Sequence, residues 1–409
     1  MTTHATSGSE TTTRAELRPA DTTGAGACVR RLDLTTFRNY AALRLDVEAA
    51  PVVLAGANGA GKTNMLEALS FLAPGRGLRK AALADVARLS DGVASPGWAV
   101  AAQAVGVHGP VALGTGMEAR SDIATGRGAA RRAVRIDGEP ARGQAAFAEH
   151  MSVVWLAPDM DRLFLEGGTA RRQFVDRMVY GFDAEHAQRL SAYETAMRGR
   201  QRLLRDGVGD VAWLAAEEET MAAMGVAIAA ARREVVARLD AAIAAEDGAR
   251  EEPFPRAGLT FAGEVEGWLD SDPALAVEDR LRDALAAGRA RDAEAGRALR
   301  GAHRSDLAVH HRTKDMPAAL CSTGEQKALL IAIVLAHARL LGLARGAAPL
   351  ILLDELAAHL DEGRRAALAE RILALGAQAW MTGTDRSLFE AFAGRAQVFE
   401  VASGRVERI

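Results

Sequence analysis

Cysteine is almost absent from this chain, which has two among its 409 residues, Cys28 and Cys321. They stand alone, with no CxxC or CxxH spacing, so the sequence offers neither a structural zinc site nor a disulfide framework. Sparse, unpaired cysteine is typical of a reducing compartment, and the cytoplasm is the expected location.

An excess of positive charge is also missing. The chain has 50 Lys and Arg against 53 Asp and Glu, a formal net charge of -3 with histidine neutral. This balance excludes a uniformly basic nucleic-acid coat, so any DNA-binding face must come from locally segregated charge.

Long apolar runs are missing as well. No stretch of about 18 uncharged apolar residues occurs, so the sequence predicts no transmembrane helix. A hydrophobic share of 49% and a charged share of 25% are those of a globular protein. Residues 1–28, rich in Thr, Ser, Ala and Gly, are predicted to form a disordered tail, and they lack the apolar core of a signal peptide.

The first part of the chain alternates short apolar runs with glycine-rich turns. Patterns of period two, or short buried runs, predict strands, and a helical spacing follows the third of them. Residues 98–140 predict an antiparallel sheet of short strands. The individual predictions are strands at Val29–Leu34, Leu43–Val47, Pro51–Ala55 and Ser152–Leu156, and a helix at Asn64–Leu72.

The middle of the chain has a helical pattern. Apolar residues from Phe182 to Met197 recur every three or four positions, and further helical patterns cover 213–245 and 274–300. We interpret residues 181–300 as an inserted arm of packed helices. Core helices within one domain would give the same pattern, so that alternative stays open. The C-terminal part predicts helices at Gln326–Leu341 and Glu362–Leu375 and strands at Leu350–Leu353 and Gln378–Thr382.

A phosphate-binding loop lies between the third predicted strand and its helix. It matches GxxxxGK[ST] at every position, which makes it a strong signal. Its glycines let backbone N–H groups surround a polyphosphate at a helix N-terminus, while Lys62 reaches the outer phosphates and Thr63 ligates magnesium. The loop residues are Gly56, Ala57, Asn58, Gly59, Ala60, Gly61, Lys62 and Thr63.

Two carboxylates follow the predicted buried strand Leu350–Leu353. Asp354 at the carboxyl end of that strand is predicted to bind the magnesium ion, and Glu355 is predicted to polarise the attacking water as the catalytic base. Alone, the pattern is that of any strand running into an acidic turn. Its pairing with a complete phosphate loop is what predicts an ATP site.

A third motif, from Ser322 to Lys327, leads into the predicted helix at Gln326–Leu341 and overlaps its first two residues. An ordinary helix N-cap would look the same. Its position before Asp354, however, resembles that of the ABC signature, usually written LSGGQ. Ser322 and Gly324 match that pattern, while Cys321, Thr323 and Glu325 depart from it.

Together these motifs resemble the ABC/SMC type of P-loop ATPases, and Phe37-Arg38-Asn39-Tyr40 with Asn58 is typical of the SMC branch. Within that branch the chain is similar to the RecF family from about residue 29 to its end. The segments that carry this resemblance are Gly75–Arg79, Ala157–Asp159, Gly167–Asp176, Gly301–Leu307 and Thr382–Asp385.

The resemblance implies an α/β fold, an ABC/SMC-type ATPase head made of residues 29–180 and 301–409 with a helical arm inserted at 181–300. It implies ATP and Mg2+ as cofactors and an ATP-dependent homodimer in which the signature of one subunit covers the nucleotide of the other. Further nucleotide-binding residues implied in this way are Arg38, Asn39, Ser322, Gly324 and Asp361.

For the family, the resemblance implies binding to gapped or junction DNA without sequence preference, and cooperation with RecR and RecO in loading RecA. Thr384 stands near the place where transporters have a switch histidine, and no Q-loop glutamine is evident near Ala157. Both departures predict slow hydrolysis.

Arginine clusters are the candidate DNA contacts, foremost Arg76 and Arg79. They are expected to bind phosphates rather than bases, because no aromatic residues interleave with them. Any one cluster is more often just a solvated face. The other candidates are Arg127, Arg131, Arg132, Arg135, Arg198, Arg200 and Arg202.

Two other functions fit the motifs. One is the nucleotide-binding subunit of an ABC transporter, and the other is an ATP-gated structural DNA clamp without useful turnover. The missing histidine and glutamine argue against the first, and Asp354 with Glu355 argues against the second.

Overall fold

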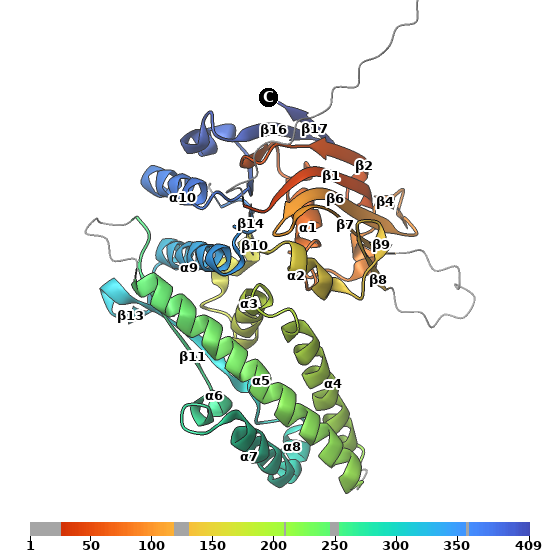
Figure 1. The fold of residues 1–409 in the computed structure, drawn as a ribbon, viewed down its shortest axis with the longest axis vertical. Helices are drawn as coiled ribbons and strands as arrows, with labels where there is room; N and C mark the ends of the chain where they lie inside the picture. The colour runs from red at the N-terminus through yellow and green to blue at the C-terminus, as the bar shows by residue number, and fades with distance from the viewer. Residues whose placement is uncertain (1–25, 118–130, 208–209, 246–252, 357–359) are drawn as a thin grey trace, which may run out of the picture.

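The structure is a computed structural model, which describes residues 26–117, 131–207, 210–245, 253–356 and 360–409. Figure 1 shows two β-sheets gathered at one end of the molecule and a group of helices extending from them at the other. The C-terminus lies at the sheet end, beside β16 and β17.

A mostly parallel sheet forms the centre of the sheet end. Its short inner strands are uninterrupted apolar runs because both faces are buried. The strand order is β10-β14-β15-β3-β16-β17, with only β17 antiparallel to its neighbour. The strands are β3 (Val52–Ala55), β10 (Val153–Leu156), β14 (Leu350–Leu353), β15 (Ala379–Gly383), β16 (Gln397–Ala402) and β17 (Arg405–Arg408).

An antiparallel sheet, in the order β2-β1-β6-β7-β8-β9, covers the parallel one. Helix α1 (Lys62–Ser70) packs between the two sheets, against β1 on one side and β14 and β15 on the other. Its strands are β1 (Cys28–Phe37), β2 (Tyr40–Asp46), β6 (Trp98–Gly106), β7 (Gly109–Met117), β8 (Arg132–Ile136) and β9 (Glu139–Pro140); β4 (Leu89–Ser90) and β5 (Val93–Ala94) pair separately.

Helix α5 (Val211–Ala244) runs from the helical end to the sheet end (Figure 1). Residues from Met221 to Ala229 lie in a separate hydrophobic cluster, whereas Val235 to Ile243 lie in the main core. The same helix therefore bridges two cores. The other helices are α2 (Phe147–His150), α3 (Gly168–Tyr180), α4 (His186–Arg205), α6 (Glu264–Trp268), α7 (Ala274–Ala287), α8 (Arg289–Ala295), α9 (Thr323–Arg345) and α10 (Glu362–Ala374).

A three-stranded sheet joins the helical region to the signature segment. It consists of β11 (Ala257–Ala262), β12 (Asp306–His311) and β13 (Met316–Pro317), all antiparallel. Strand β11 lies within residues 181–300, where only helices were predicted. The proposed domain boundaries stay a prediction.

Each strand and helix predicted for the ATPase head is present as a strand or a helix, respectively, with its ends shifted by a few residues. The predicted tail is wrong at its end, because Ala27 and Cys28 are buried and Cys28 begins β1; residues 1–25 lie outside the described residues. A Cβ on Gly26 would lie 2.7 Å from the carbonyl oxygen of Gly376, so this segment is closely packed.

Helix α9 is long and apolar enough to span a membrane by length and composition alone. However, 72% of its most apolar window is buried inside the protein. It packs against β10 and α5, so its apolar surface belongs to the core.

Candidate nucleotide-binding site

The phosphate loop connects β3 to α1 at the carboxyl edge of the parallel sheet. Gly56 has φ 154° and Gly61 has φ 118°, which L side chains rarely adopt. A Cβ on Gly56 would also lie 2.2 Å from the carbonyl oxygen of Val401. Glycine is therefore required at both ends of the loop by the backbone itself.

The segment Phe37-Arg38-Asn39-Tyr40 supports the loop from the antiparallel sheet. Tyr40 donates through its hydroxyl to the carbonyl of Gly61 (3.1 Å), and Asn39 donates to the carbonyl of Ala60 (3.2 Å). Burial raises the pKa of Tyr40, so its hydroxyl keeps its proton.

Arg38 forms a two-pronged ion pair with Glu67 on α1, at 2.8 and 2.6 Å. Glu67 is fully buried, so this pair fixes α1 against the antiparallel sheet. Arg38 and Asn39 thus hold the loop and its helix in place; their direct contact with nucleotide stays a prediction.

Lys62 folds back over the loop, where its Nζ donates to the carbonyls of Gly56 (2.7 Å) and Ala57 (2.9 Å). Burial lowers the pKa of the Lys62 ammonium, against the attraction of Glu355 and Asp354. Ala57, Asn58 and Gly59 are exposed. The loop therefore presents backbone N–H groups and a desolvated cation to a polyphosphate.

Asp354 lies beside the loop, immediately after β14. Its Oδ1 accepts hydrogen bonds from the hydroxyls of Thr63 (2.9 Å) and Thr382 (2.7 Å). Burial raises the pKa of the Asp354 carboxyl, and the neighbouring Glu355 raises it further, while the two hydroxyls act in the opposite direction. A buried carboxylate held only by hydroxyls is one that a cation would stabilise.

Magnesium fits these groups. It prefers hard oxygen ligands and usually takes only one or two from the protein, leaving the rest to phosphate and water. Thr63 and Asp354 supply two such oxygens within hydrogen-bond distance of each other. Among the described residues no group of three or more His, Cys, Asp or Glu could hold a metal ion by itself.

The signature segment caps α9 on the outside of the molecule. The Ser322 hydroxyl accepts from the Glu325 N–H, and the Glu325 carboxylate accepts from the Ser322 N–H (3.0 Å) and hydroxyl (2.9 Å). Lys314 pairs with the same carboxylate, and this bond is the main reason why the pKa of Glu325 falls to about 2.

Ser322, Thr323 and Gly324 are exposed, and a Cβ on Gly324 would meet nothing within 4 Å. The N-cap interpretation and the signature interpretation are thus compatible: Ser322 caps its own helix and also faces open space. Asp361 likewise caps α10 by accepting from Arg364 N–H (2.8 Å), and the nearby residues 357–359 lie outside the described residues.

Comparison with known proteins identifies the family. The model described as RecF/RecN/SMC N terminal domain matches residues 28–407. The DNA replication and repair protein RecF of Mesorhizobium japonicum is 53% identical over 381 residues, which cover 92% of this chain and 97% of that protein. The chain belongs to the RecF family. The RecF of Rhizobium etli strain CIAT 652 is similarly 50% identical over 376 residues, or 92% and 97% of the two chains.

Solved structures share the fold. The recombination mediator protein RecF with ATPrS, described as part of the RecFOR pathway, superposes with a TM-score of 0.79 at 18% identity and covers 94% of this chain and 99% of its own. An Smc head domain from Pyrococcus furiosus gives a TM-score of 0.51 at 16% identity, covering 94% and 96%. The expected α/β head of the ABC/SMC type is therefore confirmed.

The arginine clusters of this RecF-family chain are only partly available to DNA. Arg132 is buried, donates to the carbonyls of Phe71 and Gly75 and to Thr115, and burial lowers its pKa to about 9. Arg200 is buried in an ion-pair network. Both predictions are wrong, because clustering along the sequence does not place side chains on one face.

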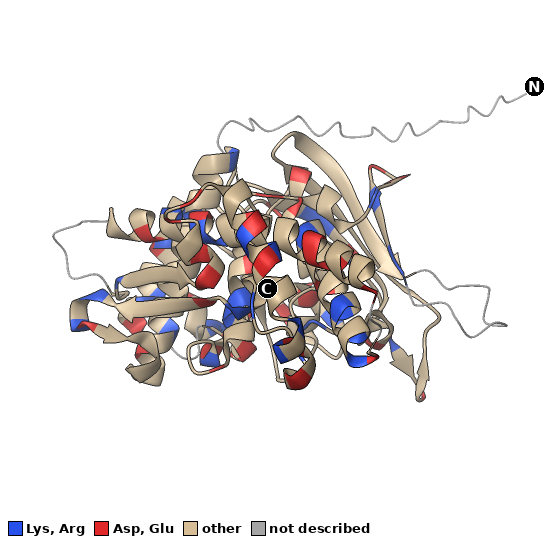
Figure 2. Cartoon of the chain, turned by 90° about the horizontal axis from the view of Figure 1, so that it is seen from below, with Lys and Arg blue, Asp and Glu red and all other residues tan. Residues whose placement is uncertain are grey.

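The remaining arginine candidates are exposed, namely Arg76, Arg79, Arg131, Arg135, Arg198 and Arg202, whereas Arg127 lies outside the described residues. Arg79 donates to Asn64 (2.8 Å) and lies 3.4 Å from Glu67, so it already has partners beside the phosphate loop. In the view of Figure 2, basic and acidic residues are interspersed. The contact of Arg76 and Arg79 with DNA stays a prediction.

Two contacts near the site were missed by sequence reasoning. Thr382 bonds to Asp354 and Glu355, and Lys327 on α9 pairs with Asp161 (2.8 Å) in the turn after β10. Both residues stand in segments already singled out, Ser322–Lys327 and Thr382–Asp385, but each contact joins parts of the chain that are far apart in sequence, so the motifs did not reveal it. The local signal for Thr382 was its place at the end of a predicted strand.

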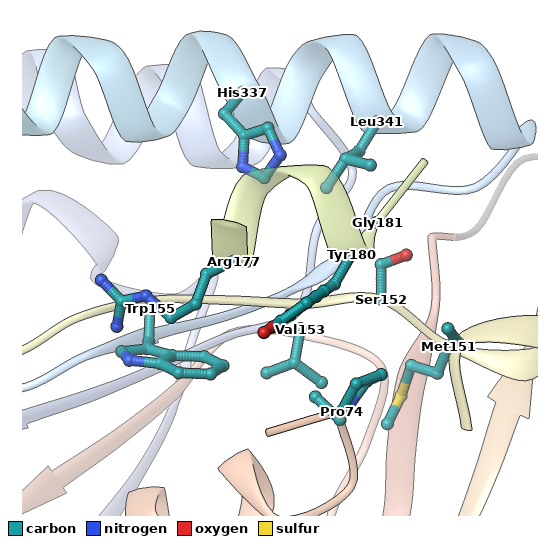
Figure 3. A pocket seen from close by; sticks show the side chains of 12 residues that line it. Pro74, Met151, Ser152, Val153, Trp155, Arg177, Tyr180, Gly181, His337 and Leu341 are labelled. Carbon is teal, nitrogen blue, oxygen red and sulfur yellow. The ribbon is translucent and has the colours of Figure 1, made fainter. Parts of the chain in front are cut away.

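A pocket elsewhere in the protein lies between β10, α3 and α9 (Figure 3). Its walls include Trp155, with the Arg177 guanidinium 5.0 Å from the ring centre, and the buried His337, whose pKa burial lowers to about 4. Phosphate-loop residues do not line it. We assign it to the packing of the core rather than to nucleotide binding.

Proposed function

We propose that this chain is an ATP-dependent DNA-binding protein of recombinational repair and replication restart. ATP and Mg2+ bind at the phosphate loop with Thr63 and Asp354, and two subunits then dimerise around the nucleotides on gapped or junction DNA. With RecO and RecR the dimer promotes RecA loading, and slow, DNA-stimulated hydrolysis releases it. The protein acts in the cytoplasm.

The observation that carries this proposal is the bond between Thr63 and Asp354, residues 291 positions apart that β3 and β14 bring to one edge of the sheet. Lys62 and the backbone N–H groups of the phosphate loop lie beside this pair, where they could bind the phosphates of ATP. Family membership supports the DNA-repair role, since the RecF relatives are described as DNA replication and repair proteins.

In the proposed reaction, Glu355 orients and activates the attacking water. The Ser322 hydroxyl and the N-terminus of α9 cover the phosphates of the partner subunit's nucleotide. Bound magnesium would supply charge neutralisation at the phosphates. Ser322 must then exchange its bond with Glu325 for one with phosphate.

The test is light scattering or size-exclusion chromatography of the purified protein with and without ATP, then with gapped DNA. Glu355→Gln should keep ATP binding and the dimer but stall hydrolysis, because only the water-activating carboxylate is lost. Ser322→Arg should keep ATP binding by the monomer yet block dimerisation, because it fills the partner's phosphate site. Identical behaviour of the two variants would contradict the shared-site model.

A further inference from the structure

Strand β15 lies between β14, which precedes Asp354, and β3, which precedes the phosphate loop. In the two registers, Leu353 pairs with Met381 and Leu54 pairs with Thr382. Thr382 is therefore the β15 residue at the level where the chain leaves β14 toward the two acids. The residue is 1% exposed.

The direction of each hydrogen bond at Thr382 is fixed by its partner. The Glu355 N–H can only donate, so the Thr382 oxygen accepts it, at 2.8 Å. The Thr382 hydroxyl proton is then free to go to Asp354 Oδ1, at 2.7 Å. One hydroxyl thus links the backbone of the water-activating acid to the side chain of the metal ligand.

Asp354 gains a fixed orientation from this arrangement. Thr63 donates to the same oxygen, Oδ1, so both hydroxyls meet on one side of the carboxylate. Among the described contacts, Oδ2 accepts no hydrogen bond. The carboxylate is therefore held by one oxygen while the other keeps its lone pairs for a cation.

Glu355 gains a fixed backbone conformation. Its φ is 53°, in the left-handed region that residues with a Cβ adopt only when their surroundings hold them there. The bond from its N–H to Thr382 is a contact that holds it. Without that bond the peptide is free to relax, and the Glu355 carboxylate moves with it.

We propose that Thr382 is a positioning residue of the ATP site, which uses one hydroxyl to orient Asp354 toward the metal and Glu355 toward the water. This inference rests on the proposed ATP-dependent function. Thr384, which stands near the place of the transporter switch histidine, is exposed two positions later. An ordinary buried threonine, with its hydroxyl satisfied for stability alone, is the competing explanation.

The experiment compares Thr382→Val, which keeps the shape and removes the hydroxyl, with Thr382→Ser, which keeps the hydroxyl. Thr384→Val is the matched control, because it makes the same change at an exposed site just after the same strand. Three quantities are measured: binding of labelled ATP in EDTA, the Mg2+ concentration that gives half-maximal ATP-driven dimerisation, and kcat with KM for hydrolysis. Thermal unfolding without nucleotide checks the fold.

Thr382→Val should bind ATP in EDTA like the native protein, because the phosphate loop is untouched. It should need about tenfold more Mg2+ to dimerise and lose about tenfold in kcat with little change in KM, the usual cost of removing a residue that orients a metal ligand. Thr382→Ser and Thr384→Val should match the native protein. If Thr382→Val fails to fold, Thr382→Ala against Thr382→Ser makes the same comparison.

Native Mg2+ dependence and kcat in Thr382→Val would overturn the inference, and so would equal losses in Thr382→Val and Thr382→Ser, which would indicate packing alone. Either result leaves the proposed function standing if the native protein binds ATP and dimerises. A native protein that binds no ATP would overturn both.

Discussion

In the helical region, the carboxylates of Glu218 and Asp292 are buried against Arg200, whereas in the nucleotide site Asp354 is buried against two threonine hydroxyls. Arg200 donates to Glu218 (2.9 Å), Asp292 (2.6 Å) and the carbonyl of Leu285 (2.7 Å). Each charge of this arm network meets an opposite charge inside the same fold. Asp354 has only neutral donors among its described bonds.

This difference distinguishes two kinds of buried charge. Those around Arg200 stabilise the fold, whereas Asp354 is suited to bind a ligand. A buried charge needs a partner, and in the network around Arg200 the fold supplies that partner internally. Where the fold supplies only hydroxyls, as at Asp354, the cation has to come with the nucleotide. Lys62 is the corresponding positive charge of the nucleotide site. Its Nζ bonds only to two neutral carbonyls among the described contacts, so its anionic partner would also come with the nucleotide.

The largest expected effect is in the arm. Arg200→Met should cost about 3–5 kcal/mol of unfolding free energy, because it leaves buried carboxylates without their cation. ATP affinity should not change. Urea unfolding and ATP titration check both expectations, with Arg198→Met, an exposed arginine paired to Glu194 on the same helix, expected to cost less than about 1 kcal/mol. Loss of ATP binding in Arg200→Met would contradict the distinction between buried charges that stabilise the fold and buried charges that bind the nucleotide.

Lys62→Met should weaken ATP binding at least about 100-fold, because a desolvated cation beside the phosphates is removed. Its stability should be close to native, since the ammonium bonds only to loop carbonyls. Equilibrium binding of labelled ATP is the measurement, and Lys80→Met, at an exposed lysine of the same domain, is the control. Near-native affinity in Lys62→Met would remove the phosphate-loop assignment.

A smaller effect is expected for DNA. Neutralising Arg76 and Arg79 to Gln should weaken every duplex about equally and reduce the salt slope by about 0.9 for each DNA phosphate that is no longer neutralised. Fluorescence anisotropy on two unrelated gapped duplexes, with and without ATP, measures this, and Arg395→Gln, at an exposed arginine outside the candidate clusters, serves as control. Tight binding without ATP, or a strong preference between the duplexes, would contradict phosphate binding by a dimer.

The sequence was sufficient where function depends on local backbone chemistry. The phosphate loop could be predicted because it matches its motif at every position between a strand and a helix, whereas Asp354 and the signature were informative only through their places relative to that loop. Strand β11 was missed because it pairs with β12 across a long helical segment. Nothing within 257–262 indicates that partner.

The arginine predictions failed for a related reason. Arg132 and Arg200 lie in sequence clusters with exposed arginines, yet each points into the core, where carbonyls or carboxylates receive it. Thr382 was overlooked because its importance comes from β15 lying between β14 and β3. Strand order in a parallel sheet is a tertiary property that no short window of sequence contains.

The most direct test compares two Asp→Asn substitutions, at Asp354 and Asp292, by urea unfolding without nucleotide at neutral pH. Because the folded pKa of Asp354 is raised above its ordinary value, its ionisation costs stability as pH rises through that pKa. Asp354→Asn should therefore stabilise the protein at neutral pH while abolishing Mg2+-dependent ATP binding, and its advantage should vanish in acid. Asp292→Asn should destabilise the protein and leave ATP binding intact. Destabilisation by both substitutions, with the same pH dependence, would contradict the account.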